Sequence, residues 1–240
     1  MKSPNELRVP LAAGGAVTAL VYEGGRPGTD GPRPSSALGA RRSALILGHG
    51  AGSGQQSSFI VGFARALAEL GIDTITFNFL YTEQNRRLPD RRPVLDSCYR
   101  AVIDLVGREA ASAGRSLFIG GKSMGGRIAT HVAAADPALP IAGLVLLGYP
   151  LHPPGRPSER RDAHLPAVRR PMLFVQGSRD TFGTPDELRP VLAALDPTPT
   201  LHIVEGGDHS FKVSKSADQA YVCASVQQAI ADWIIGRVDA

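Results

Sequence analysis

The chain has 240 residues, of which 43% are hydrophobic and 20% are charged, and 26 basic against 22 acidic side chains leave a formal net charge of +4. This composition is typical of a globular protein with a full core, so it excludes a disordered chain, and the basic excess is too small and scattered to favour nucleic-acid binding. No apolar stretch approaches the roughly 20 residues of a membrane helix, so no membrane partner is expected. Residues 1–11 hold no apolar core of a signal peptide, and there are only two cysteines, so we expect a reducing, cytoplasmic compartment. The length favours a single domain over 1–240.

Short apolar runs alternate with longer helical patterns along the chain. A strand is predicted over 17–22, followed by a long loop over Gly24–Arg42 that is rich in glycine, proline and arginine. Further strands are predicted at 44–47, 74–77, 117–119, 141–147, 172–176 and 201–204. Helices are predicted at 59–67, 95–106, 127–135 and 186–195, and a closing helix has apolar positions over 226–234.

The later strands are continuous apolar runs, which is typical of strands buried on both faces. Their alternation with helices predicts an α/β fold: a doubly wound, mostly parallel sheet flanked by helices. Ligands bind at the carboxyl ends of the strands in such sheets, so the residues after each strand are the candidates for function.

A glycine-rich loop, Gly-His-Gly-Ala-Gly-Ser-Gly over 48–54, follows the strand at 44–47. It does not fit the dinucleotide pattern Gly-x-Gly-x-x-Gly in any register, because Ser53, Gln55 and Ser57 occupy the third glycine positions. It fits the His-Gly loop that supplies an oxyanion donor in serine hydrolases, which would be the backbone N–H of Ala51. A plain flexible turn is the alternative, and His49 is expected to be structural.

An arginine cluster, Arg86, Arg87, Arg91 and Arg92, surrounds Leu-Pro-Asp at 88–90. Such a cluster can contact phosphates. No stacking aromatic residues or basic helix accompany it, so a solvated loop is the preferred interpretation.

The strand at 117–119 leads into the sequence Gly-Gly-Lys-Ser-Met-Gly-Gly at 120–126. Gly121-x-Ser123-x-Gly125 between a strand and a helix is the nucleophile-elbow pattern, in which a strained turn exposes a serine hydroxyl and the flanking glycines remove clashing side chains. The backbone N–H of Met124 would then be the second oxyanion donor. A P-loop ending in Gly-Lys-Ser is disfavoured, because it requires glycine where Ser116 stands and a loop where a strand is predicted.

Two further strand ends complete a candidate triad. Asp180 follows the strand at 172–176, and His209 follows the strand at 201–204. The order Ser123, Asp180, His209, each after its own strand, matches a serine hydrolase triad of nucleophile, acid and base. Asp208 is a less suitable acid because a sequence neighbour rarely orients the imidazole ring that follows it, and Glu205 is a weaker substitute.

The remaining titratable residues indicate no metal or cofactor. The histidines at 131, 152, 164 and 202 lack metal-ligand spacing. Cys98 and Cys223 both fall in helical patterns and are expected to be small buried hydrophobes.

The chain resembles the α/β-hydrolase superfamily, in its compact branch related to dienelactone hydrolases, and especially small predicted serine hydrolases with Gly-Lys-Ser-Met-Gly-Gly at the elbow. The resemblance spans about 44–235 and includes the segments 77–79, 83–87, 148–155 and 207–211. It implies the fold and the triad roles but no substrate. Dienelactone hydrolases use cysteine as nucleophile where Ser123 stands here, so lactone specificity is not carried over.

We therefore predict a hydrolase of an acyl bond, a carboxylic ester or thioester, acting on a small molecule as a monomer or homodimer. A non-catalytic binding module on the same fold, and a nucleotide- or nucleic-acid-binding protein, are the alternatives. The segment 149–170 is short and holds five prolines, so no large lid is expected. Pocket candidates are Tyr149, Leu151, Phe182, Phe211 and Lys122, with ordinary core packing as the alternative for the first four. Lys122 and the arginine cluster would favour an anionic leaving group, unless Lys122 simply packs beside the elbow.

Overall fold

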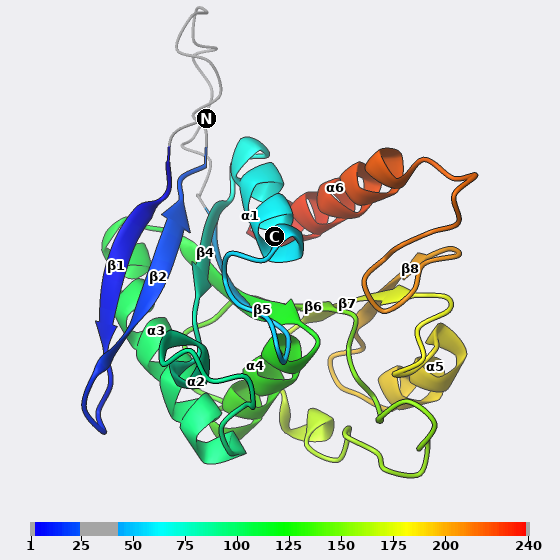
Figure 1. The fold of residues 1–240 in the computed structure, drawn as a ribbon, viewed down its shortest axis with the longest axis horizontal. Coiled ribbons are helices and arrows are strands. Elements are labelled where there is room, and N and C mark those ends of the chain that lie inside the picture. The colour runs from blue at the N-terminus through cyan, green and yellow to red at the C-terminus, as the bar shows by residue number, and fades with distance from the viewer. Residues whose placement is uncertain (1–2, 25–42, 239–240) are drawn as a thin grey trace, which may run out of the picture.

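The computed structural model describes residues 3–24 and 43–238, and an eight-stranded sheet forms its centre (Figure 1). The predicted loop over Gly24–Arg42 lies outside the described residues except for Gly24. The sheet order is β1-β2-β4-β3-β5-β6-β7-β8. The strands are β1 (Asn5–Pro10), β2 (Ala16–Tyr22), β3 (Ser43–Gly48), β4 (Asp73–Phe77), β5 (Ser116–Lys122), β6 (Gly143–Leu147), β7 (Met172–Gly177) and β8 (Thr200–Val204).

Strand pairing is parallel from β4 through β8, whereas β1 and β2 form an antiparallel edge. The predicted mostly parallel sheet is therefore confirmed. The strand order reverses between β3 and β5, which are neighbours at the centre of the sheet. The loops that leave these two strands flank the point where doubly wound sheets form ligand-binding crevices.

Helices cover both faces of the sheet. They are α1 (Ser58–Glu69), α2 (Leu80–Glu83), α3 (Arg92–Ser112), α4 (Met124–Ala135), α5 (Pro185–Ala193) and α6 (Gln219–Val238), with one short 3-10 helix, η1 (Leu165–Ala167). Helices α1 and α6 lie on one face, and α3 and α4 lie on the other (Figure 1). Residues of β3 show the division: Leu45 and Leu47 pack on the α1/α6 side, and Ile46 packs on the α3/α4 side. This two-sided burial explains the unbroken apolar strands.

Two elements carry too little hydrophobic signal to be predicted. In β1 only Val9 is buried, as expected for an edge strand. Helix α2 is a single turn. Two elements also extend beyond the predicted ranges towards the elbow, since β5 continues to Lys122 and α4 begins at Met124.

Tyr99 of α3 braces the centre of the sheet beneath the elbow. Its hydroxyl lies 2.6 Å from the carbonyl oxygen of Gly120 and accepts a hydrogen bond from the Gly120 N–H at 3.0 Å. A Cβ atom on Gly120 would lie 1.8 Å from the carbonyl oxygen of Val145, so only glycine fits there. The last residues of β5 are thereby held rigidly.

The segment between β6 and β7 contains only loop and η1, so no large lid is present over the described residues. Within residues 3–24 and 43–238, no helix combines the length and the apolar character needed to cross a membrane.

Candidate active site

Ser123 occupies a strained turn between β5 and α4. Its backbone has φ 50° and ψ −111°, a conformation that non-glycine residues rarely adopt. A Cβ atom on Gly121 or Gly125 would lie 2.2 Å from the carbonyl oxygen of Gly48, so both positions require glycine. The close packing of the elbow against β3 holds Ser123 at the carboxyl-terminal edge of the parallel strands.

The three residues predicted as a triad lie in one hydrogen-bonded line. His209 Nε2 is 2.9 Å from Ser123 Oγ, and His209 Nδ1 is 2.8 Å from Asp180 Oδ2. The Asp180 side chain is fully buried, whereas the His209 side chain is 20% exposed. With Nδ1–H donating to the carboxylate, Nε2 is free to accept the proton of the serine hydroxyl.

Gln176, a residue not singled out from the sequence, helps to hold Asp180. Its Nε2 donates to Asp180 Oδ2 at 2.9 Å and to the Gly183 carbonyl at 2.7 Å, and its Oε1 accepts from Tyr149 N–H at 2.8 Å. The other carboxylate oxygen, Asp180 Oδ1, accepts from Phe182 N–H at 2.8 Å. The signal for this role was a lone amide in the otherwise apolar run of β7.

Asp208 and Glu205, the alternative acids, play other roles. Asp208 Oδ1 accepts hydrogen bonds from Ser210 N–H at 2.7 Å and Lys212 N–H at 3.0 Å, so it shapes the loop that carries His209. Glu205 is exposed. Neither carboxylate is hydrogen-bonded to the His209 ring, which is held by Asp180.

Packing also holds His209 in place. The Phe182 ring stacks on the His209 imidazole with centroids 4.1 Å apart. Lys122, which is 8% exposed, donates from Nζ to the carbonyl oxygen of His209. A Cβ atom on Gly148 would lie 2.8 Å from Lys122 Nζ and 2.9 Å from the His209 carbonyl oxygen, so these three residues pack without spare room.

The two predicted oxyanion donors, Ala51 and Met124, line the same cavity as Ser123. Met124 is the first residue of α4, where backbone N–H groups lack intrahelical acceptors and the helix dipole favours negative charge. The loop after β3 reaches the elbow, since a Cβ atom on Gly50 would lie 3.8 Å from Ser123 Cβ. Ala51 and Met124 therefore both lie on the wall of the cavity that contains Ser123.

His49 anchors this loop from below. It is fully buried, its Nδ1 lies 2.8 Å from the Gly50 carbonyl oxygen, and its Nε2 accepts from Phe79 N–H at 3.2 Å. Burial lowers the pKa of His49 to about 4, which keeps it neutral and suits a donor at Nδ1 and an acceptor at Nε2. These contacts show that His49 has a structural role in holding the glycine-rich loop over 48–54.

A cavity of about 570 Å³ opens over Ser123 and His209. Of the predicted pocket residues, Phe182 and Lys122 line it. Tyr149, Leu151 and Phe211 do not and are buried in the core, which corrects that part of the prediction. The Tyr149 hydroxyl turns away to donate to the Arg161 carbonyl at 2.7 Å, and Phe211 packs against aromatic rings of α1.

The arginine cluster and the cysteines also differ in part from expectation. Arg86 pairs with Asp90 at 2.7 Å, and Arg92 lines the cavity together with Asp90, so this loop forms the cavity rim. Cys98 is buried, and burial raises its pKa to about 12, but Cys223 is only half-buried, so the expectation of a buried hydrophobe is wrong there.

The sequence Gly-Lys-Ser at 121–123 does not form a phosphate loop, because β5 continues to Lys122. Lys122 belongs to strand β5 rather than to a loop, as the exclusion of a P-loop required. No group of three histidine, cysteine or acidic side chains in residues 3–24 and 43–238 is arranged to hold a metal ion.

Lys122 makes protein stability depend on pH. Burial lowers its pKa from 10.5 to about 8, against the opposing charges of Asp180 and Asp208. Between these two values the unfolded chain keeps a proton that the native protein has released, so the free energy of unfolding rises with pH. Relative to Lys122→Met, the wild-type protein should gain up to about 3 kcal/mol from pH 8 to 10.5.

Urea unfolding of both proteins at several pH values in this window measures that gain. Titration of Cys98 and the tyrosines is shared by the two proteins and cancels in the difference. A difference that stays flat or falls with rising pH contradicts the expectation.

The chain is similar in sequence and fold to several known proteins. The family described as an alpha/beta hydrolase domain matches residues 41–235. A dienelactone hydrolase from Anabaena variabilis is similar, with 19% identity, a TM-score of 0.72, and coverage of 98% of this chain and 99% of that one. XC6422 from Xanthomonas campestris, described as a serine hydrolase without lid, has 21% identity and a TM-score of 0.70 over 97% and 96% of the two chains. Est1E from Butyrivibrio proteoclasticus with bound ferulic acid has 14% identity and a TM-score of 0.68 over 95% and 99%.

Proposed function

The chain belongs to the alpha/beta hydrolase domain family, and from that premise we propose that it is a serine hydrolase that cleaves an acyl bond, a carboxylic ester or a thioester, in a small-molecule substrate. The observation that carries the proposal is the line of hydrogen bonds from buried Asp180 through His209 to Ser123. A binding module has no need of a strained serine aligned with a base.

The proposed reaction uses the site in two steps. Ser123 Oγ attacks the substrate carbonyl carbon while His209 Nε2 takes its proton, and Asp180 stabilises the imidazolium that forms. The N–H groups of Ala51 and Met124 hold the tetrahedral oxyanion, each contributing roughly 2.7–4 kcal/mol. His209 then gives the proton to the leaving group, and the acyl group remains on Ser123. A water molecule, deprotonated by His209, then attacks the acyl carbon; the bond from that carbon to Ser123 Oγ breaks, His209 returns the proton to Oγ, and the acid is released.

The cavity supports a small substrate. At about 570 Å³ it falls in the size range of small-molecule sites. No large lid covers the described residues, which leaves the serine open to substrates that approach from solvent. The structurally similar Est1E binds ferulic acid, which is also a small molecule.

Labelling with a fluorophosphonate probe tests the proposal. The folded protein should be modified on Ser123 with loss of fluoride, as located by mass spectrometry of peptides. Heat-denatured protein and the Ser123→Ala variant should remain unlabelled, because the reaction requires the aligned base. If the folded wild-type protein is not labelled, a non-catalytic binding role is favoured.

A further inference from the structure

The charged residues that line the active-site cavity are mostly basic. They are Arg92, Lys122, Arg127 and Arg161, besides the triad base, against a single acidic residue, Asp90. Asp90 is already paired with Arg86 at 2.7 Å. The cavity wall therefore carries an excess of positive charge that the wall itself does not neutralise.

Arg127 lies on α4, about one turn beyond Ser123. Its Nε is buried and has no hydrogen-bond partner among residues 3–24 and 43–238. No carboxylate in the described parts of the chain lies within ion-pair distance of its guanidinium. A buried donor without an acceptor is costly, unless a bound molecule supplies the acceptor.

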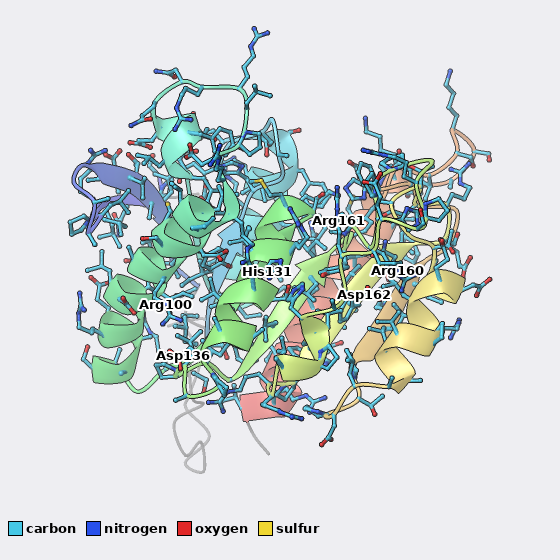
Figure 2. All side chains as sticks on the ribbon, turned by 90° about the horizontal axis from the view of Figure 1, so that it is seen from below. Arg100, His131, Asp136, Arg160, Arg161 and Asp162 are labelled. Carbon is cyan, nitrogen blue, oxygen red and sulfur yellow. The ribbon has the colours of Figure 1, made fainter. Side chains whose placement is uncertain are left out.

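Arg161 comes from the loop between β6 and β7 and is only half-buried. Its neighbours Arg160 and Asp162 pair with each other at 2.6 Å, and in Figure 2 Arg161 lies on the α4 side of that pair. Its guanidinium has no ion pair within the described residues. Burial and the nearby positive charges of Arg127 and Arg156 lower the pKa of Arg161, as expected where like charges lie close together.

The nearest acidic residue on α3 does not remove this excess. Asp96 lies 3.9 Å from Arg92 Nε, at the limit of an ion pair, and Arg92 also contacts His131 Nδ1 at 3.2 Å. The charges of Arg92, Arg127 and Arg100 act on Asp96, yet its buried Oδ1 has no hydrogen-bond partner in the part of the chain that the structure describes. The single carboxylate of Asp96 therefore cannot neutralise the several arginines around it.

We propose that Arg127 and Arg161 form an anion subsite in the active-site cavity, and that the substrate is an ester or thioester bearing a carboxylate or phosphate oxyanion. Two guanidinium groups from different elements match the oxygen geometry of either anion. The bound oxyanion relieves the repulsion between the two arginines and supplies an acceptor to Arg127. Arg92, at the rim, adds attraction for the incoming anion. This inference rests on the proposed function for its ester chemistry, but not for the anion site.

Kinetics with matched esters provide the first test. The ratio of kcat/KM for p-nitrophenyl hemiglutarate to that for p-nitrophenyl valerate isolates the effect of the terminal carboxylate. Arg127→Gln and Arg161→Gln should each lower this ratio by about 10- to 100-fold. The matched control is Arg169→Gln in the same segment between β6 and β7, whose exposed side chain lies outside the cavity lining. It should leave the ratio unchanged.

Direct binding provides a second test that does not require catalysis. Glutarate and inorganic phosphate are titrated separately into the Ser123→Ala protein by calorimetry. At least one should bind, more weakly by 10-fold or more after Arg161→Gln, with Arg161→Lys retaining part of the affinity because it keeps the charge. The anion that binds more tightly identifies the substrate group. Melting temperatures confirm that each variant is folded.

The two tests separate this inference from the proposed function. Arginine-dependent anion binding without hydrolysis of any ester supports the subsite and contradicts the hydrolase. Hydrolysis of the valerate ester, with neither anion bound and with the ester ratio unchanged in both arginine variants, overturns the subsite and leaves the hydrolase standing.

Discussion

Replacing Ser123 by alanine is expected to lower kcat/KM on a p-nitrophenyl acyl ester by about 10³-fold or more. The loss corresponds to at least about 4 kcal/mol of transition-state stabilisation, because the variant lacks the hydroxyl that lies 2.9 Å from His209 Nε2. Alanine tolerates the strained backbone of the elbow no worse than serine does, so the fold should survive. Steady-state kinetics of the purified variant measure the loss.

Ser214→Ala is a suitable control for this experiment. Ser214 is exposed and follows the His209 loop, and its hydroxyl oxygen lies 2.9 Å from that of Ser216. Its removal should change kcat/KM by less than about twofold, since surface substitutions have small effects. Full esterase activity in a folded Ser123→Ala protein would show that another residue is the nucleophile.

Replacing Asp180 by asparagine is expected to lower kcat by about 10³- to 10⁴-fold. Both carboxylate oxygens accept N–H hydrogen bonds, Oδ1 from Phe182 and Oδ2 from Gln176 and His209. In asparagine, one of these two oxygens is replaced by an amide nitrogen, which is a donor and would face another donor at either position. If it faces His209 Nδ1, the proton moves to Nε2 and the ring can no longer act as the base; if it faces Phe182, a buried donor loses its acceptor.

Loss of the acceptor for Phe182 N–H would also lower the stability of the variant. One unsatisfied buried donor costs about 1–3 kcal/mol, so Asp180→Asn should unfold at a lower urea concentration. Kinetics are therefore measured well below the unfolding transition. Asp208→Asn is the matched control, because asparagine Oδ1 can still accept from Ser210 and Lys212. Comparable losses in both variants would contradict the assignment of Asp180 as the acid.

The fold was predictable where burial leaves a repeated pattern. Strand β3 is buried along its whole length and reads as an apolar run, whereas β1 buries only Val9 and leaves no such run. The elbow was predictable for a steric reason, since both flanking glycines meet the backbone of Gly48. The triad candidates were predictable because parallel strands deliver their following residues to one edge of the sheet.

The pocket lining was less predictable. Tyr149 and Phe211 are apolar residues close in sequence to strand ends, as is Phe182, yet only Phe182 faces the cavity. A positive φ of 61° at Phe211 and the hydrogen bond from the Tyr149 hydroxyl to Arg161 turn these two side chains inward. The direction in which a loop residue points its side chain depends on contacts with residues distant in sequence, so it leaves no periodic pattern in the sequence.

By itself, the sequence determined the alternation of strands and helices, the glycine-lined elbow around Ser123 and the chain order of three residues suited to proton transfer, because hydrophobic period and backbone sterics act over a few neighbouring residues. The tertiary structure brings Asp180 to His209, as the sequence predicted, and it alone decided that Gln176 holds Asp180 and that Arg127 and Arg161 share one cavity wall. These pairings join loops from different strands, and their relative positions are set by how helices and strands pack across the whole sheet.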